Sequence, residues 1–371
     1  MKKIDFIYFE AGGGHRAAAN ALKSVIQEQA KPWDVRLVNL QEILDPLDIF
    51  RKYTGIRMED VYNLLLKKGW TLGSPQLTVA MHALIRLYHR GQVKLLKQFW
   101  ANEPRDMTVS LVPNFNRALR ESLPGKLFVT ILTDLADYPP HFWMERQDQY
   151  LVCGTKKAAE QAAALDYPAD RVFRTSGMIL RPKFYEPVTL DRAAERARLG
   201  LRADLPTGIV LFGGEGSSAM LEIARRVTAD TQFIFICGRN QKLAERLRRL
   251  PTRFPKFVEG FTSEVPYYMH LADFFVGKPG PGSISEALAM RLPVVVERNA
   301  WTLPQERYNT EWLQENEAGI VLPSFREIDR GLRELLAPER FTRFQANAAA
   351  IHNRAVFEIP DILSKLLEQH A

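Results

Sequence analysis

Short apolar runs alternate with longer stretches of helical period along the whole chain. In the first half these runs are rich in β-branched and aromatic residues and cover residues 4–9, 35–40, 107–112, 126–132 and 149–153. The second half repeats the pattern, with runs at residues 208–212, 232–237, 256–258, 274–276 and 293–296. Helical stretches between β-rich runs are typical of parallel sheets. We therefore expect an α/β protein with two doubly wound sheets.

The two sheets predict two domains. Residues 182–206 are charged, helical in pattern and bracketed by prolines, which favours an inter-domain connection there. The expected division is an N-terminal domain of residues 1–185, a C-terminal domain of residues 186–340 and a helical tail of residues 341–371. We expect the tail to be broken at Pro360 and to pack back towards the N-terminal domain.

Composition excludes several classes of protein. The chain has 371 residues, of which 46% are hydrophobic and 25% charged, so a disordered chain or a disulfide scaffold is not expected. Cys153 and Cys237 belong to no CxxC or His/Cys cluster, which argues against a zinc site and favours a reducing cytoplasm. The N-terminus does not have the pattern of a signal peptide, and no stretch approaches the roughly 20 apolar residues of a membrane span.

The net charge of +7 is unevenly distributed. Residues 1–185 hold 26 basic and 19 acidic side chains, whereas residues 186–371 hold 24 of each. The excess positive charge therefore belongs to the first half. No nucleic-acid-binding motif accompanies it, so nucleic acid is not an expected partner.

Two glycine-rich segments follow apolar runs of the second half, at Gly213–Ser217 and from Gly277 to Ala287. A glycine turn between a strand and a helix can bring N–H groups and a positive dipole end to an anion, or can serve only chain reversal. Neither segment matches the dinucleotide pattern GxGxxG or the phosphate loop GxxxxGK(S/T). Ser283 is expected to cap a helix, and Glu286 is either its capping-box partner or a ligand of ribose hydroxyls.

Six short motifs occur in order along the chain. They are Ala11–Arg16, Ile131–Leu135, Phe212–Ser217, Ile236–Asn240, Lys278–Glu286 and Gln305–Asn309. This set resembles glycosyltransferase family 28, in particular monogalactosyldiacylglycerol synthases and bacterial processive diacylglycerol glucosyltransferases, over residues 5–322. The resemblance implies a GT-B architecture, in which two Rossmann-like domains face a cleft. The UDP-sugar donor would bind to the C-terminal domain and the lipid acceptor to the N-terminal one.

The resemblance also implies which residues bind the donor. Glu286 would bind the ribose, Gly216, Ser217 and Arg181 the diphosphate, Phe261 the uracil, and Gln305 and Glu306 the sugar hydroxyls. The other donor-binding residues that it implies are Gly214, Arg239, Gly282, Ser283 and Asn309. Fixed donors of this kind stabilise the charge that grows on departing UDP. Since the chain contains no Asp-x-Asp triplet, we expect neither a metal nor another cofactor.

On the acceptor side, His15 follows the turn Gly12-Gly13-Gly14. A base of near-neutral pKa suits the removal of a proton from an attacking alcohol, and by the resemblance His15 is that base. Asp134 would orient His15 or be the base itself. From the residues alone, a His15 that only caps the turn or hydrogen-bonds a main-chain group is favoured over a base, and Asp134 could equally be an ordinary helix cap or turn aspartate. A single displacement would invert the anomeric configuration and give a β-glycoside.

Residues 53–100 mix basic and aromatic side chains and lie where the family binds its acceptor and faces the membrane. The basic residues are Arg57, Lys67, Lys68, Arg86, Arg90, Lys94 and Lys97, and the aromatic ones include Trp70, Tyr88, Phe99 and Trp100. Such a surface can dock on anionic lipid, although amphipathic helices of any protein in water have basic outer faces. We expect a cytoplasmic protein that associates peripherally with an anionic membrane surface.

Two departures from the family pattern bear on specificity. The loop Trp301–Glu306 lacks the glycine of the usual Pro-Gly-Gln-Glu, and Ala11 replaces a hydroxyl residue before the glycines. The expected activity is transfer of a hexose, galactose slightly ahead of glucose, from UDP to diacylglycerol. A polyprenyl-linked or small-molecule acceptor is an alternative. A non-catalytic protein that binds nucleotide sugar or lipid is another, against which the presence of His15, Asp134 and Glu286 together argues.

Overall fold

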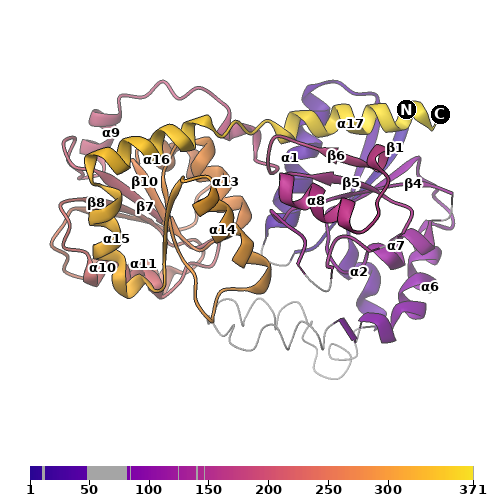
Figure 1. Cartoon of the computed structure of the whole chain (residues 1–371), viewed down its shortest axis with the longest axis horizontal. Coiled ribbons are helices and arrows are strands. Elements are labelled where there is room, and N and C mark those ends of the chain that lie inside the picture. Colours follow the sequence, from indigo (N-terminus) through magenta and orange to yellow (C-terminus); the bar gives the residue numbers. More distant parts are fainter. Residues whose placement is uncertain are drawn as a thin grey trace. The chain divides into compact units, whose positions relative to one another are not determined.

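The computed structural model describes residues 1–10, 13–47, 82–83, 85–123, 125–138, 141–145 and 147–370. In this part of the chain the strands form two parallel six-stranded sheets, and helices connect most successive strands (Figure 1). The expected α/β class with two doubly wound sheets is confirmed. Each sheet belongs to its own unit: the first contains described residues up to Pro182 and from Asn353 onwards, and the second contains Lys183–His352.

The first sheet has the strand order β2-β1-β3-β4-β5-β6. Its central strands are buried because helices cover both faces, and Ile4 of β1 pairs with Val35 on one side and Met107 on the other. The strands are β1 (Lys2–Tyr8), β2 (Trp33–Asn39), β3 (Met107–Ser110), β4 (Leu127–Ile131), β5 (Tyr150–Cys153) and β6 (Val172–Arg174). The helices are α1 (Gly14–Glu28), α2 (Leu40–Leu44), α6 (His89–Trp100), α7 (Asn116–Ser122), α8 (Lys156–Ala164) and α17 (Ala355–Gln369).

The end of the chain is divided between the two units. Helix α16 (Pro338–Ala350) belongs to the second unit, whereas α17 packs against α1 in the first (Figure 1). The predicted break at Pro360 is wrong, because this proline lies inside α17 and is buried. A proline removes one helical hydrogen bond, and the buried apolar face of α17, which includes Ile359 and Leu363, keeps the helix continuous.

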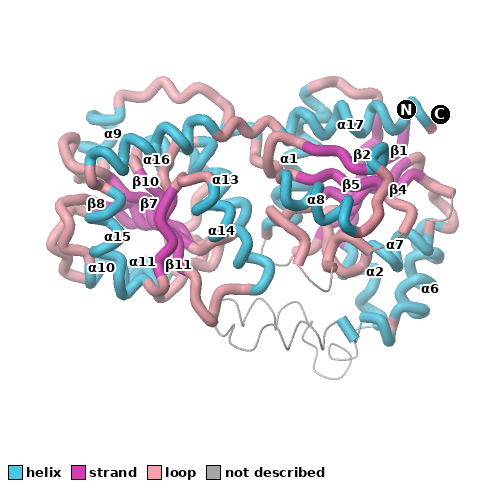
Figure 2. Tube along the Cα trace, in the orientation of Figure 1, coloured by secondary structure: helices cyan, strands magenta, loops and turns pink. Residues whose placement is uncertain are grey.

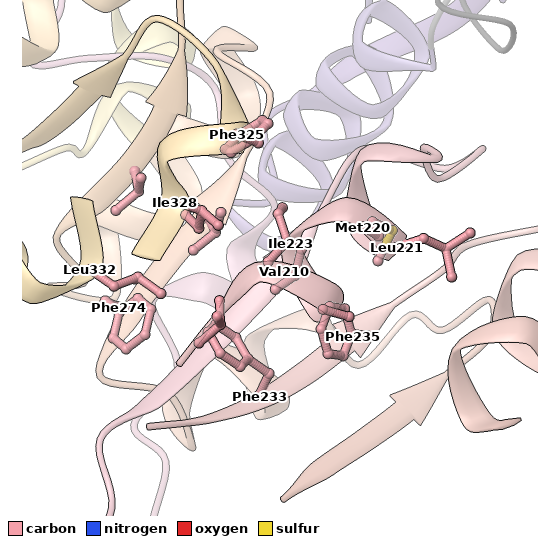
Figure 3. Packing of buried hydrophobic residues seen from close by; sticks show 14 of the residues in the cluster. Val210, Met220, Leu221, Ile223, Phe233, Phe235, Phe274, Phe325, Ile328 and Leu332 are labelled. Carbon is pink, nitrogen blue, oxygen red and sulfur yellow. The ribbon is translucent and has the colours of Figure 1, made fainter. Parts of the chain in front are cut away.

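The second sheet has the strand order β12-β11-β10-β7-β8-β9 (Figure 2). Its strands are β7 (Thr207–Leu211), β8 (Gln232–Ile236), β9 (Lys256–Glu259), β10 (Phe274–Gly277), β11 (Val294–Glu297) and β12 (Gly319–Leu322). Its other helices are α9 (Arg192–Arg198), α10 (Ala219–Arg226), α11 (Gln241–Arg249), α12 (Val265–His270), α13 (Pro281–Ala289), α14 (Arg307–Glu315) and α15 (Ile328–Leu335). Phe235 and Phe274 of the sheet meet Met220, Ile223 and Leu332 of the helices in one buried cluster (Figure 3).

Each sheet has one point at which the chain reverses its direction of travel across the strands. In the first sheet this point lies between β1 and β3, and in the second it lies between β7 and β10. Loops that leave the carboxyl ends of such neighbouring strands turn to opposite faces of the sheet and leave a crevice between them. Ligands of open α/β sheets bind at these positions, so the candidate site is sought there.

Candidate active site

The carboxyl edge of the first sheet places His15 beside the switch point between β1 and β3. His15 is the second residue of α1 and is half-buried. Its ring is hydrogen-bonded to the backbone of Leu111, which directly follows β3. Its Nδ1 atom lies 3.1 Å from Oγ1 of Thr133, two residues after β4. Segments that follow three neighbouring strands therefore fix one imidazole.

Burial lowers the pKa of His15 from 6.5 to about 4. Surroundings of low polarity disfavour the charged imidazolium, and the hydrogen bond to Leu111 opposes this effect only in part. His15 is consequently neutral at pH 7. A neutral imidazole is the form that accepts a proton in general base catalysis, but a pKa of about 4 makes His15 a weaker base than the near-neutral group expected from the sequence.

Trp143 contacts both Asp134 and the His15 ring. The indole Nε1 of Trp143 donates to Oδ2 of Asp134 at 2.9 Å, and the indole and the His15 ring have centroids 6.1 Å apart. Trp143 is fully buried, and its own backbone N–H donates to the buried carboxylate of Asp137. The two candidate catalytic residues thus adjoin one indole, whose position is fixed by a buried carboxylate.

The acceptor-side glycine turn is described only in part. Gly12 lies outside the described residues. Gly13 has a φ of 75° and directly precedes α1, a conformation that glycine adopts without strain. A Cβ atom built on Gly13 or Gly14 would meet no atom within 4 Å, so the described part of the turn borders open space.

In the second unit, the turn after β7 is joined closely to the turn after β8. The backbone N–H of Arg239 donates to the carbonyl of Gly214 at 2.8 Å. Gly238 has a φ of 58°, and a Cβ atom built on it would lie 2.1 Å from that carbonyl oxygen, so only glycine fits. Gly216, with a φ of 62°, leads into Ser217, whose Oγ accepts from the N–H of Ala219 at the start of α10.

Helix α13 begins at Pro281, so Ser283 lies inside the helix and not directly before it, where an N-cap residue lies. Its N-cap is Gly280, and no side chain caps it, so the structure excludes one of the two alternatives for Glu286, the capping box with Ser283. Proline is favoured at the first helical position because it has no N–H to satisfy. The N–H groups of Gly282 and Ser283 have no partner within the helix, and a Cβ built on Gly282 would meet no atom within 4 Å. Glu286 lies half-buried one turn further along α13.

The motifs of residues 278–286 and 305–309 meet in one place. Glu306 is buried at the end of a short 3₁₀ helix (Pro304–Glu306), directly after the half-buried Gln305, and its Oε1 accepts from Nζ of Lys278 at 3.0 Å. Asn309 is fully buried and donates from Nδ2 to the carbonyl of Pro279 at 2.7 Å. Asn309 therefore anchors the loop after β10, and direct contact with the donor stays a prediction.

An exposed aromatic ring lies beside the joined turns. Phe261 is 61% exposed, and the guanidinium carbon of Arg239 lies 4.9 Å from its ring centroid. Nη1 of Arg239 also lies 3.5 Å from Oε1 of Glu215. A flat ring supported by a guanidinium on one side suits stacking of a nucleobase.

Arg181 belongs to the first unit, one residue before the unit ends at Pro182, and is half-buried. Its contact with the diphosphate stays a prediction. In the described part of the chain, no group of three or more His, Cys, Asp or Glu is placed to hold a metal ion. No described helix is long and apolar enough to cross a membrane.

Comparison with known proteins identifies the architecture. No family model matches the chain. It is 27% identical to a probable chloroplastic monogalactosyldiacylglycerol synthase of Glycine max, over all of this chain and 72% of the relative. The chain is a GT-B glycosyltransferase related to the monogalactosyldiacylglycerol synthases. Acinetobacter baumannii MurG shares its fold at a TM-score of 0.62 and 14% identity, covering 98% of this chain and 100% of MurG. Anabaena Alr3699/HepE in complex with UDP-glucose does so at 0.56 and 15%, covering all of both chains.

The predicted basic surface of this glycosyltransferase falls partly outside the described residues, which do not include Arg57, Lys67, Lys68 and Trp70. Trp100 is buried, and its Nε1 donates to Oδ2 of Asp5 at 2.8 Å. The predicted role of Trp100 in docking is therefore wrong, because its indole belongs to the core.

Helix α6 and the residues before it keep a basic outer side. Arg86, Arg90, Lys94 and Lys97 are exposed, as is Leu87 at 76%. Phe99 is 37% exposed and Tyr88 is half-buried. A cavity of about 1090 Å³ adjoins this surface. Among its lining residues are four arginines: Arg86, Arg90, Arg117 and Arg120.

Sequence reasoning missed three residues that shape the two sites of the glycosyltransferase. Thr133 lies inside the quoted motif Ile131–Leu135, but only the fold shows that its hydroxyl meets His15. Trp143 follows Asp134 by nine residues, a separation that carries no periodic signal. Lys278 lies within the quoted motif Lys278–Glu286, and a cation in such a glycine-rich segment could have been noted as a phosphate ligand.

Proposed function

We propose that the chain is an inverting hexosyltransferase that moves a sugar from UDP to diacylglycerol and forms a β-glycosyldiacylglycerol. The observation that carries the proposal is the position of His15, whose imidazole is held at the switch point of the first sheet by the backbone of Leu111 and the hydroxyl of Thr133. Similarity to a monogalactosyldiacylglycerol synthase along the whole chain favours diacylglycerol as acceptor and galactose slightly over glucose.

The proposed reaction is one displacement. The acceptor hydroxyl gives its proton to His15 while its oxygen attacks the anomeric carbon from the side opposite UDP. The bond between that carbon and the diphosphate oxygen breaks, and its electron pair leaves with UDP. Asp134, held by Trp143, either orients the acceptor and His15 or takes the proton itself.

In the second unit, the donor is proposed to bind at the carboxyl edge between β7 and β10. The open start of α13 and the turn before α10 offer N–H groups to the diphosphate. Phe261 and Arg239 would stack on the uracil, Glu286 would bind the ribose, and Gln305 with Glu306 would contact the sugar. The UDP-glucose complex of the similarly folded HepE supports a UDP-sugar as donor.

The first unit is proposed to dock on an anionic membrane surface through α6. Arg90, Lys94 and Lys97 follow one another at intervals of four and three residues, which places them along one exposed side of the helix. Each basic residue near an anionic surface contributes about 1 kcal/mol, so this row would add about 3 kcal/mol. The cavity beside α6 is lined by four arginines and by two glutamates, Glu121 and Glu145, and its excess of arginines would favour anionic headgroups.

The activity test offers diacylglycerol in mixed micelles with radiolabelled UDP-galactose or UDP-glucose to the full chain. We expect a β-linked glycolipid by NMR of the product, formed faster from UDP-galactose. His15→Gln should abolish turnover if His15 is the base, and Asp134→Asn should abolish turnover if Asp134 is the base.

An α-anomer in the product would refute inversion. Turnover only with a polyprenyl-linked or small acceptor would favour the enzyme alternative, and UDP-sugar binding without transfer to any acceptor the non-catalytic one.

The docking test measures flotation with vesicles of phosphatidylcholine alone or with added phosphatidylglycerol. We expect binding only to the anionic vesicles, weakened by salt and by the triple change Arg90, Lys94 and Lys97→Glu. A matched control changes three exposed residues of α11 at the same spacing to Glu. They are Lys242, Arg246 and Arg249. Equal loss in both triple variants would contradict docking through α6.

A further inference from the structure

A lysine of the second unit lies where the two glycine-rich turns approach each other. Strands β7 and β10 are neighbours on either side of the switch point. The turn Gly213–Ser217 follows β7, and Lys278 directly follows β10. The two segments therefore border the crevice in which open α/β sheets bind their ligands.

The side chain of Lys278 spans the distance between these turns. A Cβ atom built on Gly213 would lie 3.8 Å from Cε of Lys278. A Cβ built on Gly280, the N-cap of α13, would lie 3.6 Å from Nζ of Lys278 and 3.6 Å from Oε1 of Glu306. The ammonium group is thus next to the turn after β7 and next to the start of α13 at once.

Glu306 holds the ammonium in this position. Its carboxylate is buried, with 9% of the side chain exposed, and accepts from Nζ of Lys278 at 3.0 Å. The Lys278 side chain itself is 41% exposed. A buried carboxylate is costly unless it is paired, so Glu306 fixes the lysine while one side of the lysine borders the crevice.

We propose that Lys278 is the cation that binds the diphosphate of the donor and stabilises its growing charge as the sugar leaves. Glu306 is then a positioning residue for Lys278, in addition to its proposed contact with the sugar. The inference rests on the proposed function, since it requires a nucleoside diphosphate at the second sheet. An ammonium supplies a compact positive charge with three N–H donors, which suits phosphate oxygens.

The alternative is that Lys278 only neutralises the buried Glu306. The two possibilities differ in the double variant Lys278→Met with Glu306→Gln, which replaces the ion pair by a neutral pair of similar size. If the lysine serves only Glu306, the double variant restores nucleotide binding. If it binds the diphosphate, the double variant binds UDP as weakly as Lys278→Met alone.

The test is calorimetric titration of the full-length protein with UDP and, by competition, with uridine. Because a hydrogen bond to a charged group contributes about 1.5–3 kcal/mol, Lys278→Met should weaken UDP about 10- to 100-fold and leave uridine affinity unchanged. Lys278→Arg should keep UDP affinity within a few-fold. Lys242→Met, an exposed lysine on α11, is the matched control and should bind like wild type. Circular dichroism verifies that each variant is folded.

The outcomes separate the inference from the proposed function. Wild-type UDP affinity in Lys278→Met, equal loss for UDP and uridine, or rescue by the double variant would overturn the role of Lys278 while leaving the proposed function intact. Failure of the wild-type chain to bind either UDP or a UDP-sugar would overturn both. A loss that is specific to the diphosphate and persists in the double variant supports the inference.

Discussion

The lowered pKa of His15 predicts how kcat/KM depends on pH. In its proposed role as base, His15 must be neutral to take the proton of the acceptor alcohol, and burial lowers its pKa from 6.5 to about 4. The base form is therefore present above pH 4 and is lost only as the pH falls through that value. We expect kcat/KM to remain level between pH 5.5 and 7 and to fall in acid with a midpoint near pH 4.

The magnitude follows from the two pKa values. At pH 5.5 an imidazole of pKa 4 is about 97% neutral, whereas one of pKa 6.5 is about 9% neutral. An unperturbed histidine would thus lose roughly tenfold in kcat/KM between pH 7 and 5.5, and the buried one almost nothing. A tenfold difference is well outside the error of steady-state rates.

The assay is the pH profile of kcat/KM with UDP-galactose and diacylglycerol, with the micelles and ionic strength held constant. NMR titration of the histidine ring nitrogens assigns the acid limb of the profile, and the resonance absent from His15→Gln identifies His15. A kinetic limb near pH 6.5 that coincides with titration of the His15 resonance would refute the reasoning. A His15 resonance that stays neutral down to pH 5 supports it.

Substitutions at three further positions test what holds each site in place. Thr133→Val removes the hydroxyl that contacts Nδ1 of His15, and it should lower kcat about tenfold while KM for the donor stays unchanged. Thr133→Ser should restore the rate. An unchanged kcat in Thr133→Val would exclude a positioning role for Thr133. Gly238→Ala should destabilise the protein by about 2 kcal/mol or more in thermal unfolding, since its Cβ would lie 2.1 Å from the Gly214 carbonyl oxygen. Gly282→Ala, with no atom within 4 Å, should unfold like wild type, and equal Tm losses in the two alanine variants would contradict this account.

The fold could be predicted because most strands are continuous apolar runs, which parallel sheets require when both faces are covered. The two strands that the pattern missed are the edge strands β6 and β12. Val172–Arg174 of β6 is short and only partly buried, so its residues lack the apolar signal of the central strands. Pro360 led to a wrong prediction of a helix break. The burial of one face of α17 stabilises the helix more than the proline destabilises it.

Only the glycine-rich loops of the candidate site could be predicted from the sequence. The turns after β1, β7 and β10 were found because close approach and positive φ values demand glycine at particular positions. Contacts between side chains from different loops leave no such signal. The pairing of Lys278 with Glu306 joins residues 28 positions apart, and it depends on strand order rather than on local sequence.

The row of basic residues on α6 supports a function for this helix besides packing in the core. The inner side of α6 packs in the core, where Leu96 and Trp100 are buried. The sequence HRGQVKLLKQFW contains no acidic residue, and Arg90, Lys94 and Lys97 form no ion pair with a described residue. Like charges four residues apart destabilise a helix by about 0.2–0.5 kcal/mol per pair, and interspersed charges of both signs would give the same solubility without this cost. Lys97, in the last turn, also interacts favourably with the helix dipole. A row of one sign gains most beside a surface of the opposite sign, so under the proposed docking its effect should appear in membrane binding and not in the stability of the fold.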